Sequence, residues 1–153
     1  MALRSAAPAD EAFLADLHAD RHRPELAALG WPEPAVREFL DLQLRAQESG
    51  YGTAFPEADH RIILEHRSPV GRLLLDRRPD EHLMIDLVVL HHCRGRGIGT
   101  VVLRTVQDEA LAAGVPVRLT VRRDDRRLVG WYEALGWCAD DQDDCHLSMV
   151  FRH

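Results

Sequence analysis

The residues with the most distinctive chemistry lie in the stretch HHCRGRGIGT, residues 91–100, directly after the apolar run LMIDLVVL. A glycine-rich turn between a strand and a helix leaves several backbone N–H groups without partners, and the helix dipole adds partial positive charge there. Such a turn can hold a phosphate, and flanking arginines can add charge-assisted hydrogen bonds. The alternative is a plain tight turn that binds nothing. The residues concerned are Arg94, Gly95, Arg96, Gly97 and Gly99.

The spacing of these glycines excludes two common phosphate motifs. A P-loop needs GxxxxGK followed by Ser or Thr, and this chain contains no lysine. The dinucleotide fingerprint GxGxxG is also unmatched, because the glycines run G-R-G-I-G and no βαβ repeat surrounds them. A net charge of −6 argues against nucleic-acid binding. We therefore expect a small phosphate-containing ligand.

A second candidate for chemistry is Asp86, which interrupts an otherwise apolar strand. A carboxylate is costly to bury without a partner, so this side chain should meet a cleft, water or a cation. In a cleft it could accept a proton as a general base. The other interpretation is a purely structural pairing with an arginine such as Arg72 or Arg78.

Histidines at helical spacing raise the question of a metal. His18 and His22 stand at i and i+4, a spacing that can hold zinc, but no HExxH glutamate accompanies them. The remaining histidines and cysteines form no ligand framework either, and we predict no metal site.

The elements that must position these residues follow from the apolar pattern. Apolar residues at helical spacing and capping residues predict four helices, and short apolar runs between turn residues predict strands. The predicted helices cover residues 8–22, 35–50, 98–113 and 124–135, and the predicted strands cover residues 3–5, 60–66, 69–78, 81–90, 115–121 and 145–151. No repeat or linker divides the 153 residues. We expect one mixed α/β domain, residues 1–153.

Three cysteines without a CxxC pair suit a reducing compartment. No apolar stretch reaches the roughly 18 residues that a membrane helix needs, and the N-terminus lacks a long apolar region. We expect a cytoplasmic protein without membrane contact.

Two motifs carry a family resemblance. Arg94-x-x-Gly97-x-Gly99 resembles the acyl-CoA signature [QR]-x-x-G-x-[GA] of the GNAT N-acetyltransferase superfamily. The segment LVGWYEALGW, residues 128–137, is similar to the lYeklGF segment of the same family. The order of predicted elements also looks like that of the family, so the resemblance covers nearly the whole chain.

The resemblance implies a mixed α/β (α+β) fold. Its sheet would be mostly antiparallel, with six to seven strands and about four flanking helices, and would splay open at the cofactor strand. It implies acetyl-CoA as cofactor, with the pantetheine arm lying against the backbone of Val88, Val89 and Leu90 like an added strand. The pyrophosphate would lie on Arg94, Gly95, Arg96, Gly97, Ile98, Gly99 and Thr100.

The resemblance also implies catalytic roles. Tyr132 occupies the position of the donor to the leaving thiolate, although a tyrosine in WYEAL could simply pack in the core. Many family members have Glu where this chain has Leu83, so the base would be Asp86, or Glu81 and His82 through water.

Another departure from the family pattern concerns the cofactor. Asp125 replaces a frequent Asn, and we interpret it first as a helix cap and second as a cofactor contact.

The predicted function is transfer of an acetyl group to a primary amine of a small molecule or peptide, by direct attack in a ternary complex. The alternative is a non-catalytic acyl-CoA binding or sensing domain. Side chains on the acceptor side would contact the substrate or form the contact of a homodimer. The candidates are Trp31, Tyr51, Phe55 and His82.

Overall fold

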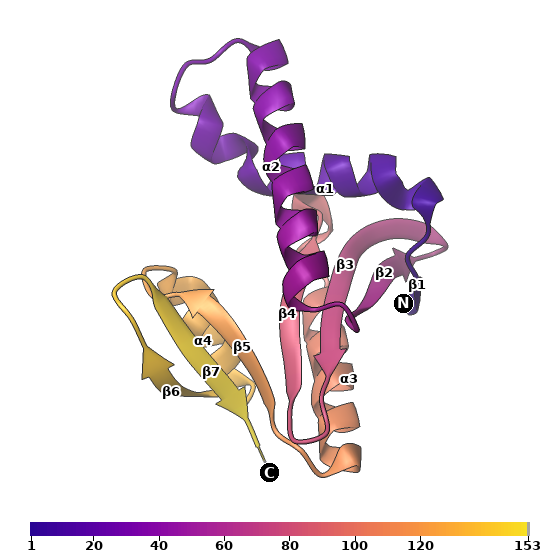
Figure 1. The fold of residues 1–153 in the computed structure, drawn as a ribbon, viewed down its shortest axis with the longest axis vertical. Coiled ribbons are helices and arrows are strands. Elements are labelled where there is room, and N and C mark those ends of the chain that lie inside the picture. The colour runs from indigo at the N-terminus through magenta and orange to yellow at the C-terminus, as the bar shows by residue number, and fades with distance from the viewer. Residues whose placement is uncertain (153) are drawn as a thin grey trace. The chain divides into compact units, whose positions relative to one another are not determined.

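The computed structural model describes residues 1–152, and within them the chain forms seven strands and four α-helices (Figure 1). The strands are β1 (Ala2–Ser5), β2 (Asp59–Glu65), β3 (Ser68–Arg77), β4 (His82–Val89), β5 (Val117–Arg122), β6 (Cys138–Gln142) and β7 (His146–Phe151). The helices are α1 (Glu11–Ala27), α2 (Glu33–Ala54), α3 (Ile98–Ala113) and α4 (Arg126–Ala134), with 3₁₀ turns η1 (Pro8–Asp10) and η2 (His91–Cys93).

The strands form one mixed sheet in the order β1-β2-β3-β4-β5-β7-β6. β4 and β5 pair in parallel through His82 with Val117 and Leu83 with Arg118, at the start of β4. The predicted splay of the sheet at this strand stays a prediction. The predicted fold class is confirmed.

Two compact units make up the chain, and β3 and β4 run through both. The first unit comprises residues 1–74 and 86–99, and the second comprises residues 75–85 and the chain from residue 100 onward.

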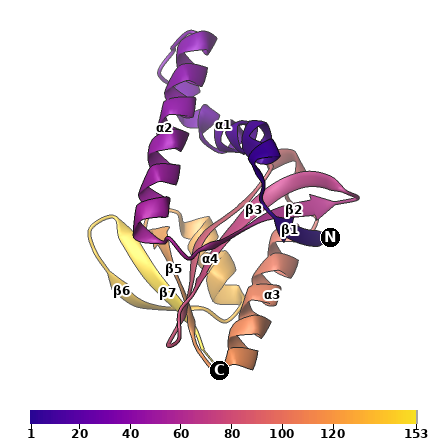
Figure 2. The same cartoon turned by 45° about the vertical axis from the view of Figure 1, so that its right-hand side comes forward.

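In the first unit, helices α1 and α2 pack on each other and β1 lies beside β2 (Figure 2). Ala19, Val36 and Leu40 form the buried contact between the two helices. β2 and β3 join through a tight turn at His66 and Arg67, which both have positive φ, as the two central residues of a type I′ hairpin turn require.

In the second unit, β5 and β7 pair antiparallel over their full length, and an aromatic cluster connects them to α4. Trp137 is 2% exposed and its ring lies between those of Tyr132 and Phe151. The Trp137 indole N–H donates to Gln107 Oε1 of α3 over 3.0 Å. Helices α3 and α4 are therefore fixed to one core.

Two predicted helix ends were wrong. α1 continues through Pro24 to Ala27, and α2 continues through Gly50 to Ala54. A proline inside a helix removes one hydrogen bond and bends the axis, and Figure 1 shows α1 changing direction along its length. A glycine in a helix costs only about 1 kcal/mol relative to alanine, which packing can offset.

Strand β6 was not predicted. All five of its residues are exposed, and its register against β7 shifts between Ala139 and Asp141. The strand is the last in the sheet order, so it has a neighbour on one side only. The apolar alternation that reveals a half-buried strand is missing here.

None of the helices within residues 1–152 combines the length and the apolar character that crossing a bilayer would require.

Candidate functional site

The glycine segment forms the connection from β4 to α3. Gly95 and Gly97 have φ of +80° and +82°, a conformation that side chains rarely adopt. A Cβ at either position would meet no atom within 4 Å, so open space lies in front of this backbone. The amide of Arg94 still donates within the turn, to His91, while the first amides of an α-helix have no intrahelical acceptor. The geometry suits an anion.

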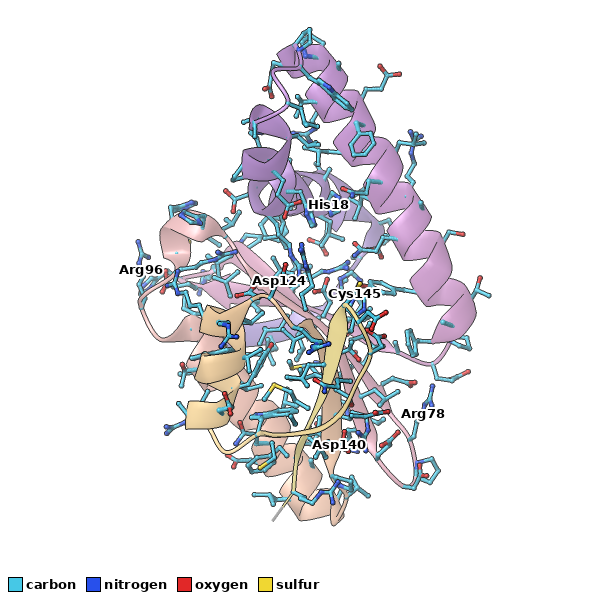
Figure 3. The ribbon with its side chains drawn as sticks, turned by 90° about the vertical axis from the view of Figure 1, so that its left-hand side faces the viewer. His18, Arg78, Arg96, Asp124, Asp140 and Cys145 are labelled. Carbon is cyan, nitrogen blue, oxygen red and sulfur yellow. The ribbon has the colours of Figure 1, made fainter. Side chains whose placement is uncertain are left out.

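Both arginines of the segment have partners inside the first unit. Arg94 Nε donates to the carbonyl oxygen of Val89 over 3.2 Å, so this side chain folds back on the end of β4. Arg96 Nη1 pairs with Glu65 at 2.7 Å, yet its side chain is 55% exposed. Figure 3 shows Arg96 at the outer side of the turn. Arg96 is thus an accessible cation beside the turn.

The backbone of β4 has one side against β3. The Leu90 amide donates to Val70 over 2.8 Å, and the Val88 carbonyl oxygen lies against Gly71. Successive residues of a strand direct their amides to opposite sides, so Val89 directs its backbone away from β3. Of the three residues predicted to bind pantetheine, Val89 is therefore the one whose backbone N–H and C=O groups do not face β3.

Asp86 is buried in an ion network of the first unit. Its Oδ2 accepts from Arg72 Nε at 3.0 Å and Nη2 at 2.8 Å, and its Oδ1 accepts from Arg21 Nη1 at 3.1 Å. Arg72, 3% exposed, also donates to Glu48 over 2.5 Å. Pairing with Arg72, one of the two interpretations of the sequence, is present, while Arg78 pairs with Asp76. The role of Asp86 as base stays a prediction.

The electrostatics of this network follow from burial. Burial acts to lower the pKa of Arg72, but the two carboxylates outweigh it and raise that pKa. Burial lowers the pKa of His18, His22 and His60, so these imidazoles are neutral near pH 7. His18, labelled in Figure 3, contacts Gln43 through Nε2 at 2.9 Å. Within residues 1–152 no three potential metal ligands cluster.

The second unit holds the predicted residues Tyr132 and Asp125. Tyr132 is 6% exposed, with its ring against those of Trp131 and Trp137. The Trp131 indole N–H donates to Thr100 Oγ1 over 3.3 Å, so the position of Tyr132 is tied to the first turn of α3. Asp125 caps α4 by accepting from the Leu128 amide at 3.2 Å.

The alternative base residues lie elsewhere in the second unit. His82 is 5% exposed, and its Nδ1 is buried without a hydrogen bond, 3.7 Å from Glu109 Oε2. Glu81 accepts from Arg118 over 3.3 Å. His82 therefore contacts α3 and stands apart from solvent, while Glu81 is partly exposed.

The three aromatic residues predicted for the acceptor side do not all come together. Trp31 packs on Phe39, with ring centroids 5.5 Å apart. Tyr51 lies beside Phe55 and 5.9 Å from the Arg72 guanidinium carbon. Twelve residues of helix, about 18 Å, separate Phe39 from Tyr51.

Several residues of the network were missed in the sequence. Arg21 and Asp20 come from α1 and Glu48 comes from α2, where charged residues are expected on solvated faces. The available signal was Arg72, a cation inside the apolar strand PVGRLLLD, which implied a buried carboxylate partner.

A model of the acetyltransferase (GNAT) family matches residues 13–137. A search of curated proteins gave no significant match.

Several solved structures share the fold. The paia N-acetyltransferase from Thermoplasma acidophilum, in complex with coenzyme A, superposes with a TM-score of 0.72 at 15% identity, covering 99% of this chain and 98% of that one. The ribosomal-protein-S18-alanine N-acetyltransferase from Escherichia coli gives 0.63 at 15% identity, with 98% and 92% covered.

A third structure has the ligand in place. The GNAT family acetyltransferase from Elizabethkingia anophelis with acetyl-CoA bound gives a TM-score of 0.61 at 12% identity, covering 71% of this chain and 82% of that one. At these identities the likeness concerns the fold, and the family match spans most of the sequence. This chain belongs to the acetyltransferase (GNAT) family.

Proposed function

We propose that this protein is an acetyl-CoA-dependent N-acetyltransferase that acetylates a primary amine of a small molecule or peptide in a ternary complex. The observation that carries the proposal is the turn before α3. There, Gly95 and Gly97 have positive φ with open space in front of them, in a chain of the acetyltransferase family. Similar structures have been solved with coenzyme A and acetyl-CoA.

The residues present fit this cofactor. The amides that begin α3 would hold the pyrophosphate, and Arg96 would add a cation at the rim. The backbone of Val89, directed away from β3, would hydrogen-bond the pantetheine arm. Its carbonyl oxygen already accepts from Arg94, and a carbonyl oxygen can accept a second hydrogen bond. We further propose that both units act as one domain, because the family match extends over both.

When bound, acetyl-CoA supplies the thioester carbonyl and a thiolate leaving group. An attacking amine must first be neutral, although its pKa in water is about 8 for an α-amino group and about 10.4 for a lysine side chain. We assign proton removal to Asp86 or, through water, to the partly exposed Glu81, because His82 is buried. Tyr132 would donate a hydrogen bond from its hydroxyl to the leaving sulfur. On the acceptor side, the hydroxyl of Tyr51 would contact the amine substrate.

The test has a binding arm and a turnover arm. Calorimetry with CoA should show a saturable site, and acetyl-CoA mixed with a panel of amines should release free thiol. Binding without turnover across the panel would identify a sensor. Absence of binding by the folded protein would refute the proposal.

Two variants test which tyrosine hydroxyl donates to the leaving sulfur. Tyr132→Phe should lower kcat about a hundredfold, the lower range for a proton donor, and leave CoA affinity unchanged. Tyr51→Phe removes the only other tyrosine hydroxyl of the chain and should change KM for the amine with little effect on kcat. Equal kcat values for wild type and Tyr132→Phe would remove Tyr132 from the mechanism. Cytoplasmic location and a homodimer stay predictions.

A further inference from the structure

One turn of helix α1 holds the end of β4 at two points. Asp20 Oδ2 accepts a hydrogen bond from the backbone amide of His91 over 2.7 Å. Its neighbour Arg21 donates from Nη1 to Asp86 Oδ1 over 3.1 Å. Between these two contacts lies the segment 87–90, which includes the backbone that we assign to pantetheine. Both ends of this segment are therefore tied to the same helix.

The contact of Asp20 lies where the strand ends. β4 ends at Val89, and His91 begins the 3₁₀ turn η2 that leads into the glycine segment. Within that turn, Cys93 donates to Leu90 and Arg94 donates to His91, so the later amides have local acceptors. The His91 amide instead has a carboxylate that comes from a helix 71 residues earlier in the chain. Hydrogen bonds to a charged acceptor are shorter and stronger than those between neutral groups.

Neither contact of this helical turn is needed to form the helix itself. Asp20 and Arg21 lie in the middle of α1, away from its capping positions Asp10 and Ala28, so their side chains do not cap the helix. Arg72 already gives two hydrogen bonds to Asp86, and Arg21 binds the remaining oxygen. The two side chains thus act on β4 and the turn after it.

We propose that Asp20 is a positioning residue for coenzyme A binding. By fixing the His91 amide, its carboxylate sets the path of the backbone into Gly95 and Gly97, and the amides that begin α3 are held ready for the pyrophosphate. Arg21 supports it at the other end of the segment. This inference rests on the proposed function for the identity of the ligand, while the contact between Asp20 and His91 is tested without any ligand.

The experiment compares wild type with three variants of Asp20 and one control. Amide hydrogen exchange of His91 is followed by NMR, and the Kd for CoA is measured by calorimetry. Asp20→Ala should accelerate His91 exchange about tenfold and raise Kd about tenfold, the effect of losing one charge-assisted hydrogen bond. Asp20→Asn keeps an oxygen acceptor and should stay within about threefold of wild type. At saturating acetyl-CoA, kcat should be unchanged.

The matched control is Asp16→Ala. Asp16 lies one turn earlier on the same helix and pairs with Arg37 of α2, 3.0 Å away, so its removal makes the same charge change without touching β4. It should leave His91 exchange and Kd at wild-type values. Should Asp20→Ala fail to fold, Asp20→Glu keeps the charge with a longer side chain, and exchange and Kd should both still rise.

The outcomes separate the two proposals. Wild type that does not bind CoA overturns the proposed function and the positioning role with it, while protected His91 exchange still supports the contact. Wild type that binds CoA, together with an Asp20→Ala variant of equal affinity, overturns the positioning role alone. Rapid His91 exchange in wild type overturns the contact itself.

Discussion

The close approach of β3 and β4 at Gly71 makes a sharp prediction. An alanine Cβ at this position would overlap the carbonyl oxygen of Val88 and lie 3.1 Å from Val89 Cα and from Ile63 Cδ1. The first two atoms belong to the backbone of β4 and cannot rotate away. Gly71→Ala therefore requires a shift of the strand that we assign to the cofactor.

Overpacking of this kind costs about 1–3 kcal/mol in the free energy of unfolding. For a chain of this length each kcal/mol lowers the melting temperature by about 2–4 °C, so we expect Gly71→Ala to melt about 2–12 °C below wild type. Differential scanning calorimetry measures the melting temperature. Because the displaced backbone includes Val89, the Kd for CoA should rise in the same variant.

Gly50→Ala is the matched control. Gly50 lies inside α2, and a Cβ there would meet no atom within 4 Å. The same chemical change should be neutral or stabilise the protein by up to about 1 kcal/mol. If Gly71→Ala melted at the temperature of wild type or of Gly50→Ala, the close approach of the two strands would be refuted.

Two further predictions concern the core and the acid side of the stability curve. Trp137→Phe removes the hydrogen bond to Gln107 and leaves buried space, and urea unfolding should show a loss of about 2–3 kcal/mol, against a smaller loss for the less buried Trp131→Phe. The hydrogen bonds from Arg4 hold the pKa of Asp10 at about 2, so its contribution to stability is full above about pH 4 and is lost as the pH falls toward 2. The difference in unfolding midpoint between wild type and Asp10→Asn should be largest near neutral pH and shrink below pH 4, and a constant difference would contradict this assignment.

The sequence predicted those elements whose signals are local. The apolar residues of α3 recur at helical spacing, and the helix ends before Gly114, whose φ of +72° is typical of a helix C-terminus. The cap at Asp125 was also predicted, because an aspartate before a helical pattern can accept from the first turn. The glycine segment between β4 and α3 lies where it was predicted.

The remaining features depend on contacts that no local pattern reveals. Pro24 lies within α1, because tertiary packing can outweigh one lost hydrogen bond. The pairing of Asp86 with Arg21 joins residues 65 positions apart, and the sequence offered only Arg72 as a partner. Periodicity predicts which face of an element is buried, and it leaves open which charges meet there.

The exposed strand β6 has a consequence for the behaviour of the protein at high concentration. A free edge of a sheet can recruit the strand of another molecule, which starts aggregation. Here the edge carries Asp140 and Asp141, and its irregular register interrupts the regular row of backbone groups. Arg118 pairs with Asp140 at 2.6 Å and offsets its charge, so Asp141 and the irregular register are what disfavour the pairing of two such edges.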